Sequence, residues 1–176
     1  MRGKNTLNVL IAFALGASTV LVAKTKLTFD PNAFYAGHDK KEAAAMLLAE
    51  GEKLAGDDTW ERIGAGRVAY QTGDKKRGEA LFEAVLAGKH GKNDLYRIAT
   101  AYAAAKSWDK AKPLFEQAIA MDAGDDSGIM KAGCWFNLNG DRKRAEELFG
   151  MAFAHAPDHA WHYILASGSY QGVEPF

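Results

Sequence analysis

The chain repeats its own pattern at intervals of about 33 to 34 residues, and this period constrains the fold more than any single motif does. Three stretches, each a turn followed by a phenylalanine, align with one another: residues 73–82, 106–115 and 140–149. Small residues stand before these turns at Gly66, Ala99 and Gly133, and again at Ser167. A repeat of this length holds two short antiparallel helices, so the sequence predicts an all-α solenoid of helix hairpins.

The recurring residue types have a physical reason. Each helix pair has an apolar face that it cannot bury alone, so neighbouring pairs must stack. Small residues let helices cross closely, and large rings fill the space between units; these rings are Phe82, Phe115 and Phe149. Gly73 and Gly140 are expected to take a positive φ where the two helices of a unit meet. Asp58, Asn93 and Asp126 are predicted to cap successive helices.

At these positions the chain resembles the tetratricopeptide repeat (TPR) family, whose units carry a large residue, Leu, Gly, Tyr, then Ala, Phe, Ala and Pro. The third unit matches at Ile129, Ala132, Gly133, Phe136, Ala145, Phe149, Ala152 and Pro157. The second unit matches at Leu95, Ile98, Ala99, Tyr102, Ala111, Phe115 and Ala118, and the first departs from the pattern at Arg62 and Ala69. The resemblance covers residues 59 to about 170 and implies a TPR-like α-solenoid.

That resemblance implies a helical domain over residues 40–176. Its repeats would lie at about 59–92, 93–125 and 126–159, with capping helices over 39–56 and 160–170. Residues 24–39 would form a connector that leads into this domain, and a hydrophobic N-terminal helix would precede it.

Residues 1–23 differ from the rest of the chain. Arg2 and Lys4 precede an apolar run, and no charge falls between Lys4 and Lys24. This layout is typical of a signal or anchor helix, with residues 8–23 in the membrane. Both an uncleaved anchor and a cleaved signal fit the length, so two locations are expected: a domain anchored on the periplasmic or extracytoplasmic side, or a soluble periplasmic protein.

Composition and candidate reactive groups argue against several functions. The formal net charge is +0, which gives no basis for nucleic-acid binding. Cys134 is the only cysteine, and we expect it to be a packing residue. His155, His159 and His162, with Asp158, could approximate metal ligands, but we interpret them as solvated histidines at a helix corner. We therefore expect no enzyme, no cofactor and no metal.

In TPR-like proteins the first helix of each unit lines a concave groove. Carrying these positions over predicts a partner-binding groove of Trp60, Ile63, Arg67, Tyr70, Tyr96, Arg97, Thr100, Met130, Lys131, Asn137, Trp161 and Ile164. Gln71, Asn93, Ser127 and Cys134 fall in the same registers. One register, Ile63, Tyr96, Met130 and Ile164, is apolar throughout, and basic residues run beside it at Arg67, Arg97 and Lys131. A protein partner with apolar anchors and some acidic residues is therefore expected.

Two functions follow from this groove. The preferred one is a non-enzymatic interaction scaffold on the non-cytoplasmic side of a membrane, which docks a partner helix or peptide and supports a membrane or envelope complex. The alternative is a structural subunit of a larger membrane complex, held by its N-terminal helix, with its groove filled by residues 24–39. Whether Phe29, Phe34 and Tyr35 lie in the groove would distinguish the two.

Overall fold

The computed structural model describes residues 31–176, so the predictions for residues 1–23 and for 24–30 of the connector lie outside the described residues. Within residues 31–176 the chain forms one short 3₁₀ helix and eight α-helices, with no strand, which confirms the all-α class. The helices are η1 (Pro31–Phe34), α1 (Lys40–Ala55), α2 (Thr59–Gln71), α3 (Lys75–Ala87), α4 (Lys92–Ala104), α5 (Trp108–Met121), α6 (Asp126–Leu138), α7 (Arg142–His155) and α8 (Ala160–Tyr170).

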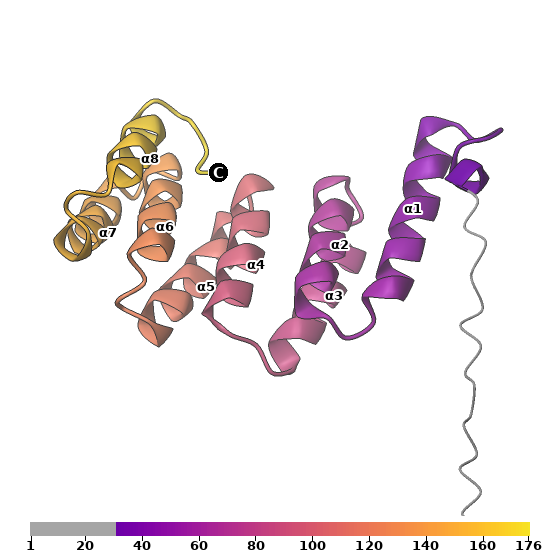
Figure 1. The fold of residues 1–176 in the computed structure, drawn as a ribbon, viewed down its shortest axis with the longest axis horizontal. Coiled ribbons are helices and arrows are strands. Elements are labelled where there is room, and N and C mark those ends of the chain that lie inside the picture. The colour runs from indigo at the N-terminus through magenta and orange to yellow at the C-terminus, as the bar shows by residue number, and fades with distance from the viewer. Residues whose placement is uncertain (1–30) are drawn as a thin grey trace, which may run out of the picture.

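Successive helices pack against one another along the length of the molecule, from α1 at one end to α7 and α8 at the other (Figure 1). Helices α2, α4, α6 and α8 contact each other in sequence and form an inner layer. Helices α3, α5 and α7 each pack against the inner helix that precedes them. This serial packing is that of an α-solenoid, as the repeat period predicted.

The helix crossings of the first and third pairs use the same contact. A Cβ added at Gly66 would lie 2.7 Å from Cε1 of Phe82, and one added at Gly133 would lie 2.8 Å from Cε1 of Phe149. Both rings are buried, so neither can retreat from an added methyl group. In the second pair Ala99 stands at the crossing and is fully buried. Burying each ring contributes about 1.5–3 kcal/mol, so these crossings hold the pairs together.

The turns within the units carry the expected backbone conformation. Gly73 and Gly140 have φ values of 105° and 86°, which confirms the predicted left-handed turns. Lys106 stands at the matching turn of the second unit and takes a φ of 61° in spite of its side chain. There Ser107 donates its backbone N–H to the carbonyl of Tyr102 and closes the turn.

Helix caps depart from the prediction at two of three positions. Asp58 caps α2 as expected, because its carboxylate accepts from the backbone N–H of Glu61. The prediction for Asn93 and Asp126 was wrong, since both lie inside the first turn of their helices. Asp125 is the N-cap of α6, where its carboxylate accepts from the N–H of Gly128.

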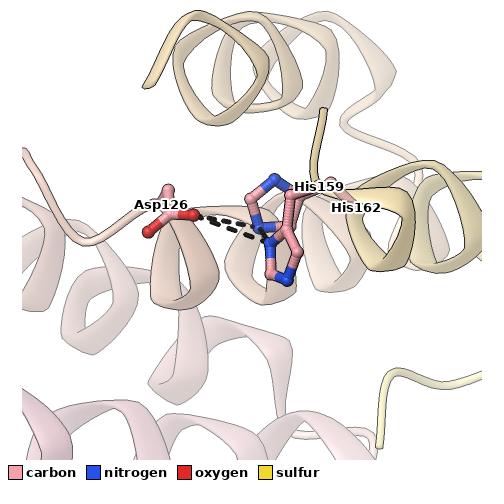
Figure 2. Close-up of side chains that lie close together, drawn as sticks. All are labelled: Asp126, His159 and His162. Atoms are coloured by element: carbon pink, nitrogen blue, oxygen red, sulfur yellow. Dashed lines mark hydrogen bonds and ion pairs between the residues drawn. The ribbon is translucent and has the colours of Figure 1, made fainter. Parts of the chain in front are cut away.

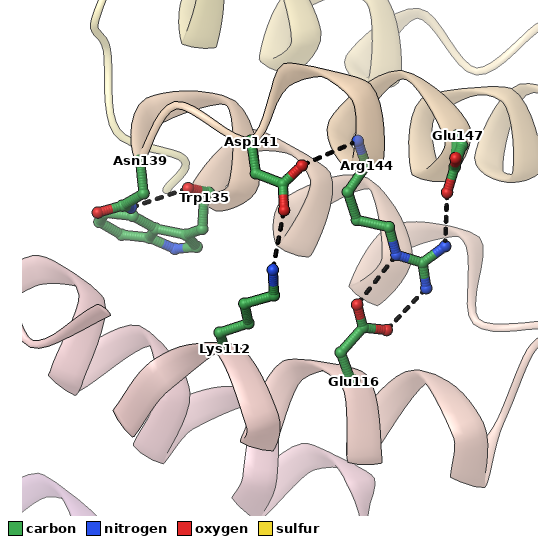
Figure 3. Close-up of polar contacts among 7 residues, drawn as sticks. All are labelled: Lys112, Glu116, Trp135, Asn139, Asp141, Arg144 and Glu147. Carbon is green, nitrogen blue, oxygen red and sulfur yellow. Dashed lines mark hydrogen bonds and ion pairs between the residues drawn. The ribbon is translucent and has the colours of Figure 1, made fainter. Parts of the chain in front are cut away.

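Charged side chains tie α5 to α7 on the outer layer (Figure 3). The guanidinium of Arg144 donates to both carboxylate oxygens of Glu116, at 3.0 and 2.7 Å, and to Glu147 of its own helix. Nζ of Lys112 donates to Asp141 at 2.9 Å, and the other oxygen of Asp141 accepts from the backbone N–H of Arg144. These contacts fix the start of α7 against the preceding outer helix.

Helix α1 is the most exposed end of the described chain. Ala55 is its only buried residue, and Met46, Leu47 and Leu54 are exposed. The helix packs on α2 and on η1. Across residues 31–176, no helix combines the length and the apolar composition that crossing a membrane requires.

Candidate functional site

A cavity of about 880 Å³ opens on the inner layer, across α2, α4 and α6. Its lining residues are Trp60, Ile63, Gly64, Arg67, Asn93, Tyr96, Arg97, Thr100, Ala104, Phe115, Asp125, Ser127, Gly128, Lys131, Trp135, Glu174, Pro175 and Phe176. Its volume falls within the range of small-molecule and peptide sites.

The floor of the cavity depends on a close contact between α4 and α6. A Cβ added at Gly128 would lie 2.6 Å from Cε2 of Tyr96, so this position admits the tyrosine ring only because it has no side chain. The ring of Tyr96 packs in turn on Phe115, with centroids 6.3 Å apart. Burial, followed by the nearby Asp125 and Asp122, raises the pKa of Tyr96 and keeps its hydroxyl neutral. The floor is therefore aromatic and uncharged.

Basic side chains surround this floor. Arg67, Arg97 and Lys131 all line the cavity, and within residues 31–176 none of them forms an ion pair. The guanidinium of Arg97 lies over the ring of Trp60, which orients both side chains. Burial lowers the pKa of Arg97, but an arginine remains charged at neutral pH.

Two acidic residues of the described chain line the cavity, and both carboxylates are engaged with cations that do not line it; that of Glu174 lies 3.9 Å from Nζ of Lys106. Oδ2 of Asp125 lies 3.0 Å from Nζ of Lys92, and Oδ1 caps α6. The cavity therefore offers positive charge around an apolar floor.

The segment after α8, residues 171–176, turns back toward α4 (Figure 1), and its last three residues, 174–176, line the cavity. Gly172 has a φ of 82°, and Val173 donates its N–H to the carbonyl of Gly168, which turns the chain back. The ring of Phe176 meets the ring of Trp161 edge-on at 5.1 Å, although 69% of Phe176 remains exposed. Sequence reasoning missed this segment; the apolar Val173 and Phe176 after the end of a helix were the available signal.

Seven of the predicted groove residues line the cavity: Trp60, Ile63, Arg67, Tyr96, Arg97, Thr100 and Lys131. Asn93 and Ser127, from the same registers, also line it. These residues come from three of the four inner helices, α2, α4 and α6, so the structure brings together positions that are distant in the sequence.

The other predicted groove residues lie elsewhere. Tyr70 is 2% exposed, packs on the rings of Phe82 and Tyr102, and borders a separate recess. Met130 is fully buried in the core. Asn137 faces α8, where its Nδ2 donates to the hydroxyl of Ser169. These three side chains are engaged within the protein and do not reach the cavity.

Trp161 and Ile164 are exposed on α8 but are not among the lining residues. Trp161 borders the site indirectly, through its contact with Phe176. Of the proposed filling segment 24–39, Phe34 and Tyr35 lie beside each other before α1 and do not line the cavity. Phe29 is outside the described residues.

The candidate reactive residues fall into two groups. Cys134 is fully buried, and burial raises the pKa of its thiol to about 11, so it stays protonated at neutral pH. Two of the three histidines, His159 and His162, do come together, but with Asp126 of the preceding inner helix (Figure 2). His155 and Asp158, which the sequence grouped with them, are not part of this cluster.

Comparisons with protein-family models, with curated proteins and with solved structures found no match to the chain. The basis for a functional proposal is therefore the chemistry of the cavity and of the residues around it.

Proposed function

We propose that the protein is a non-enzymatic scaffold that docks a peptide or helix of a partner protein in the cavity between α2, α4 and α6. The bound segment carries an acidic residue close to an aromatic or other apolar anchor. One observation carries the proposal: Arg67, Arg97 and Lys131 surround an aromatic floor without ion-pair partners of their own within residues 31–176. An apolar anchor fills such a floor, and acidic groups satisfy the surrounding cations.

The chain's own residues 174–176, Glu-Pro-Phe, support this ligand chemistry. Glu174 lies at the cavity, with its carboxylate 3.9 Å from Nζ of Lys106, and Phe176 adds an aromatic ring. A partner segment of the same composition would contact the same lining residues of the cavity. It would have to displace these residues from their end of the cavity.

The rest of the proposal rests on the sequence. The repeat pattern supports a TPR relationship, in which groove binding of peptides is the usual activity. The apolar run of residues 8–23 supports attachment to or export across a membrane, with the helical domain on the non-cytoplasmic side, where it assists the assembly or stability of a membrane or envelope complex.

The test uses the full chain in mild detergent and a fluorescent peptide with the sequence of residues 171–176. Reversing the cavity charges with Arg67→Glu, Arg97→Glu and Lys131→Glu should weaken peptide binding at least tenfold, a change of about 1.4 kcal/mol. A peptide with Glu174→Lys and Phe176→Ser should not bind. Phe176→Ala in the protein should strengthen binding, because the competing internal segment loses its anchor.

The matched control reverses three exposed lysines outside the cavity, with Lys76→Glu, Lys89→Glu and Lys143→Glu. This variant has the same net charge as the cavity variant and should keep wild-type affinity. Equal loss in both variants would mean that binding follows only net charge. No saturable binding to the wild type or to Phe176→Ala would refute the proposal.

A further inference from the structure

Two inner helices bring three potential metal ligands to one point (Figure 2). Both helices lie toward the end of the solenoid away from α1 (Figure 1). Asp126 is the first residue of α6, His159 is the N-cap of α8, and His162 lies in the first turn of α8. Helices α6 and α8 pack side by side, so the starts of both helices meet. The two rings and the carboxylate point toward one another.

The ligand atoms form a small triangle. Nδ1 of His159 lies 2.9 Å from Nε2 of His162, and Oδ2 of Asp126 lies 3.2 Å from Nε2 of His162 and 3.8 Å from Nδ1 of His159. A tetrahedral zinc ion with bonds of about 2.0–2.1 Å separates its ligands by about 3.3 Å. The three distances between ligand atoms lie on both sides of this value. Side-chain shifts of a few tenths of an ångström would therefore allow the ion to bind without moving a helix.

Nε2 of His162 lies within reach of both Nδ1 of His159 and Oδ2 of Asp126, and one N–H at Nε2 can be directed at only one of them. His162 is 1% exposed, and its Nδ1 has no hydrogen-bond partner among residues 31–176. A cation bound at Nε2 places the ring proton on Nδ1, and one ion bonds all three ligand atoms together.

The three side chains are of the kinds that bind zinc. Neutral imidazole nitrogens and a carboxylate are the ligands that zinc takes in proteins. His159 and Asp126 have side chains 47% and 30% exposed, so a fourth position faces solvent and can hold water.

We propose that Asp126, His159 and His162 form a binding site for one zinc ion, which joins the start of α8 to the start of α6. The ion has three protein ligands and an open solvent-facing position. It stabilises the docking of α8, the helix that covers α6 and leads into residues 171–176. This proposal does not depend on peptide binding in the cavity.

Titration of the metal-free full chain with zinc chloride tests the site. Calorimetry should show one saturable site per chain, and a hundredfold excess over the Kd should raise the melting temperature by roughly 5–10 °C. Cobalt(II), used as a spectroscopic substitute, should develop the intense visible absorption of a tetrahedral site. Zinc should remove that absorption stoichiometrically.

His159→Ala removes an exposed ligand and Asp126→Asn keeps the side-chain shape; each should weaken zinc binding at least tenfold, which reduces the thermal shift at the same zinc concentration by about half or more. His155→Ala removes an exposed histidine of α7 outside the triangle and serves as the matched control, with wild-type binding expected. The metal-free melting temperatures of these variants establish that they fold. Wild-type chain without a saturable site, or His159→Ala and Asp126→Asn that both bind like His155→Ala, would overturn the proposal.

Discussion

In the pairs α2–α3 and α6–α7, a glycine lies under a phenylalanine ring and a second glycine of positive φ joins the helices. Their inner helices nevertheless show different faces. Arg67 of α2 is exposed at the cavity, whereas Cys134, at the matching position of α6, is fully buried. Helix α8 packs on α6, and its Ser169 hydroxyl accepts from Asn137, one turn after Cys134.

The comparison separates two sets of residues. The residues at the helix crossings hold each pair together and are the same type in both pairs, so they form the scaffold. The outward-facing residues of the inner helices differ between the pairs, and they form the surface that a ligand contacts. Changing one set should leave the other intact, and the following predictions test this separation in order of decreasing effect.

The largest effect is expected when the buried rings are removed. Phe82→Ala and Phe149→Ala should each lower the free energy of unfolding by about 3–5 kcal/mol, because both leave a cavity at an equivalent crossing. Urea denaturation monitored by circular dichroism measures this change. Phe176→Ala, at an exposed ring, is the control and should leave stability nearly unchanged. A difference above about 2 kcal/mol between the two core variants would mean that the crossings are not equivalent.

A smaller loss is expected when the crossings are widened. Gly66→Ala and Gly133→Ala should each cost about 1–3 kcal/mol, because the new methyl group meets a buried ring that has no room to move. Gly64→Ala, in the same helix as Gly66, and Gly150→Ala, in α7 of the same pair as Gly133, are matched controls, because an added Cβ at either position meets nothing within 4 Å. The controls should gain up to about 1 kcal/mol from better helix propensity. The urea denaturation midpoints should therefore fall for the crossing variants and rise slightly for the controls. Equal changes in the two sets would contradict the prediction.

The smallest effect concerns the N-caps of the outer helices. Asp74 and Asp141 cap α3 and α7 in the same way, but Asp141 also accepts from Lys112 (Figure 3). The Lys112 ammonium, followed by the backbone N–H of Arg144, holds the pKa of Asp141 below its usual range. The stabilisation is therefore complete above the ordinary aspartate pKa of about 3.9 and is lost as the pH falls through the lower folded-state value.

Lys112→Met should accordingly lower the urea midpoint at pH 7 by less than any substitution at the crossings, since the pair is at the surface. The difference from wild type should shrink as the pH falls below 4 and vanish once Asp141 is protonated. Lys143→Met, a change of an exposed lysine in the same outer layer, controls for the loss of one charge. A difference that persisted at low pH would show that Lys112 acts through packing instead of through Asp141.

Local patterns in the sequence were sufficient to predict the helix pairs and their turns. Glycine at Gly73 and Gly140 and the spacing to Phe82 and Phe149 are set by contacts within one helix hairpin, and a repeat displays them several times. The pattern did not predict the left-handed conformation of Lys106, because the second unit adopts it without a glycine.

The candidate site depended on longer-range contacts. Carrying a groove register from unit to unit assumes that every inner helix has the same surroundings. This fails for Met130, which is fully buried, and for Asn137, which donates to Ser169 of α8. The carboxylate predicted to lie beside the histidines, that of Asp158, was wrong for a similar reason. Asp158 is adjacent in the sequence, but Asp126 starts the neighbouring inner helix at the same level, one repeat earlier.

Gly66, Ala99 and Gly133 touch no part of the cavity, yet they influence its shape. Each sets the distance between the two helices of a unit, and that distance fixes the small rotation from one unit to the next. In a solenoid these rotations add up to the curvature of the whole. The central crossing differs from its neighbours by the one methyl group of Ala99, so the radius of the binding face is adjustable at positions that no ligand contacts.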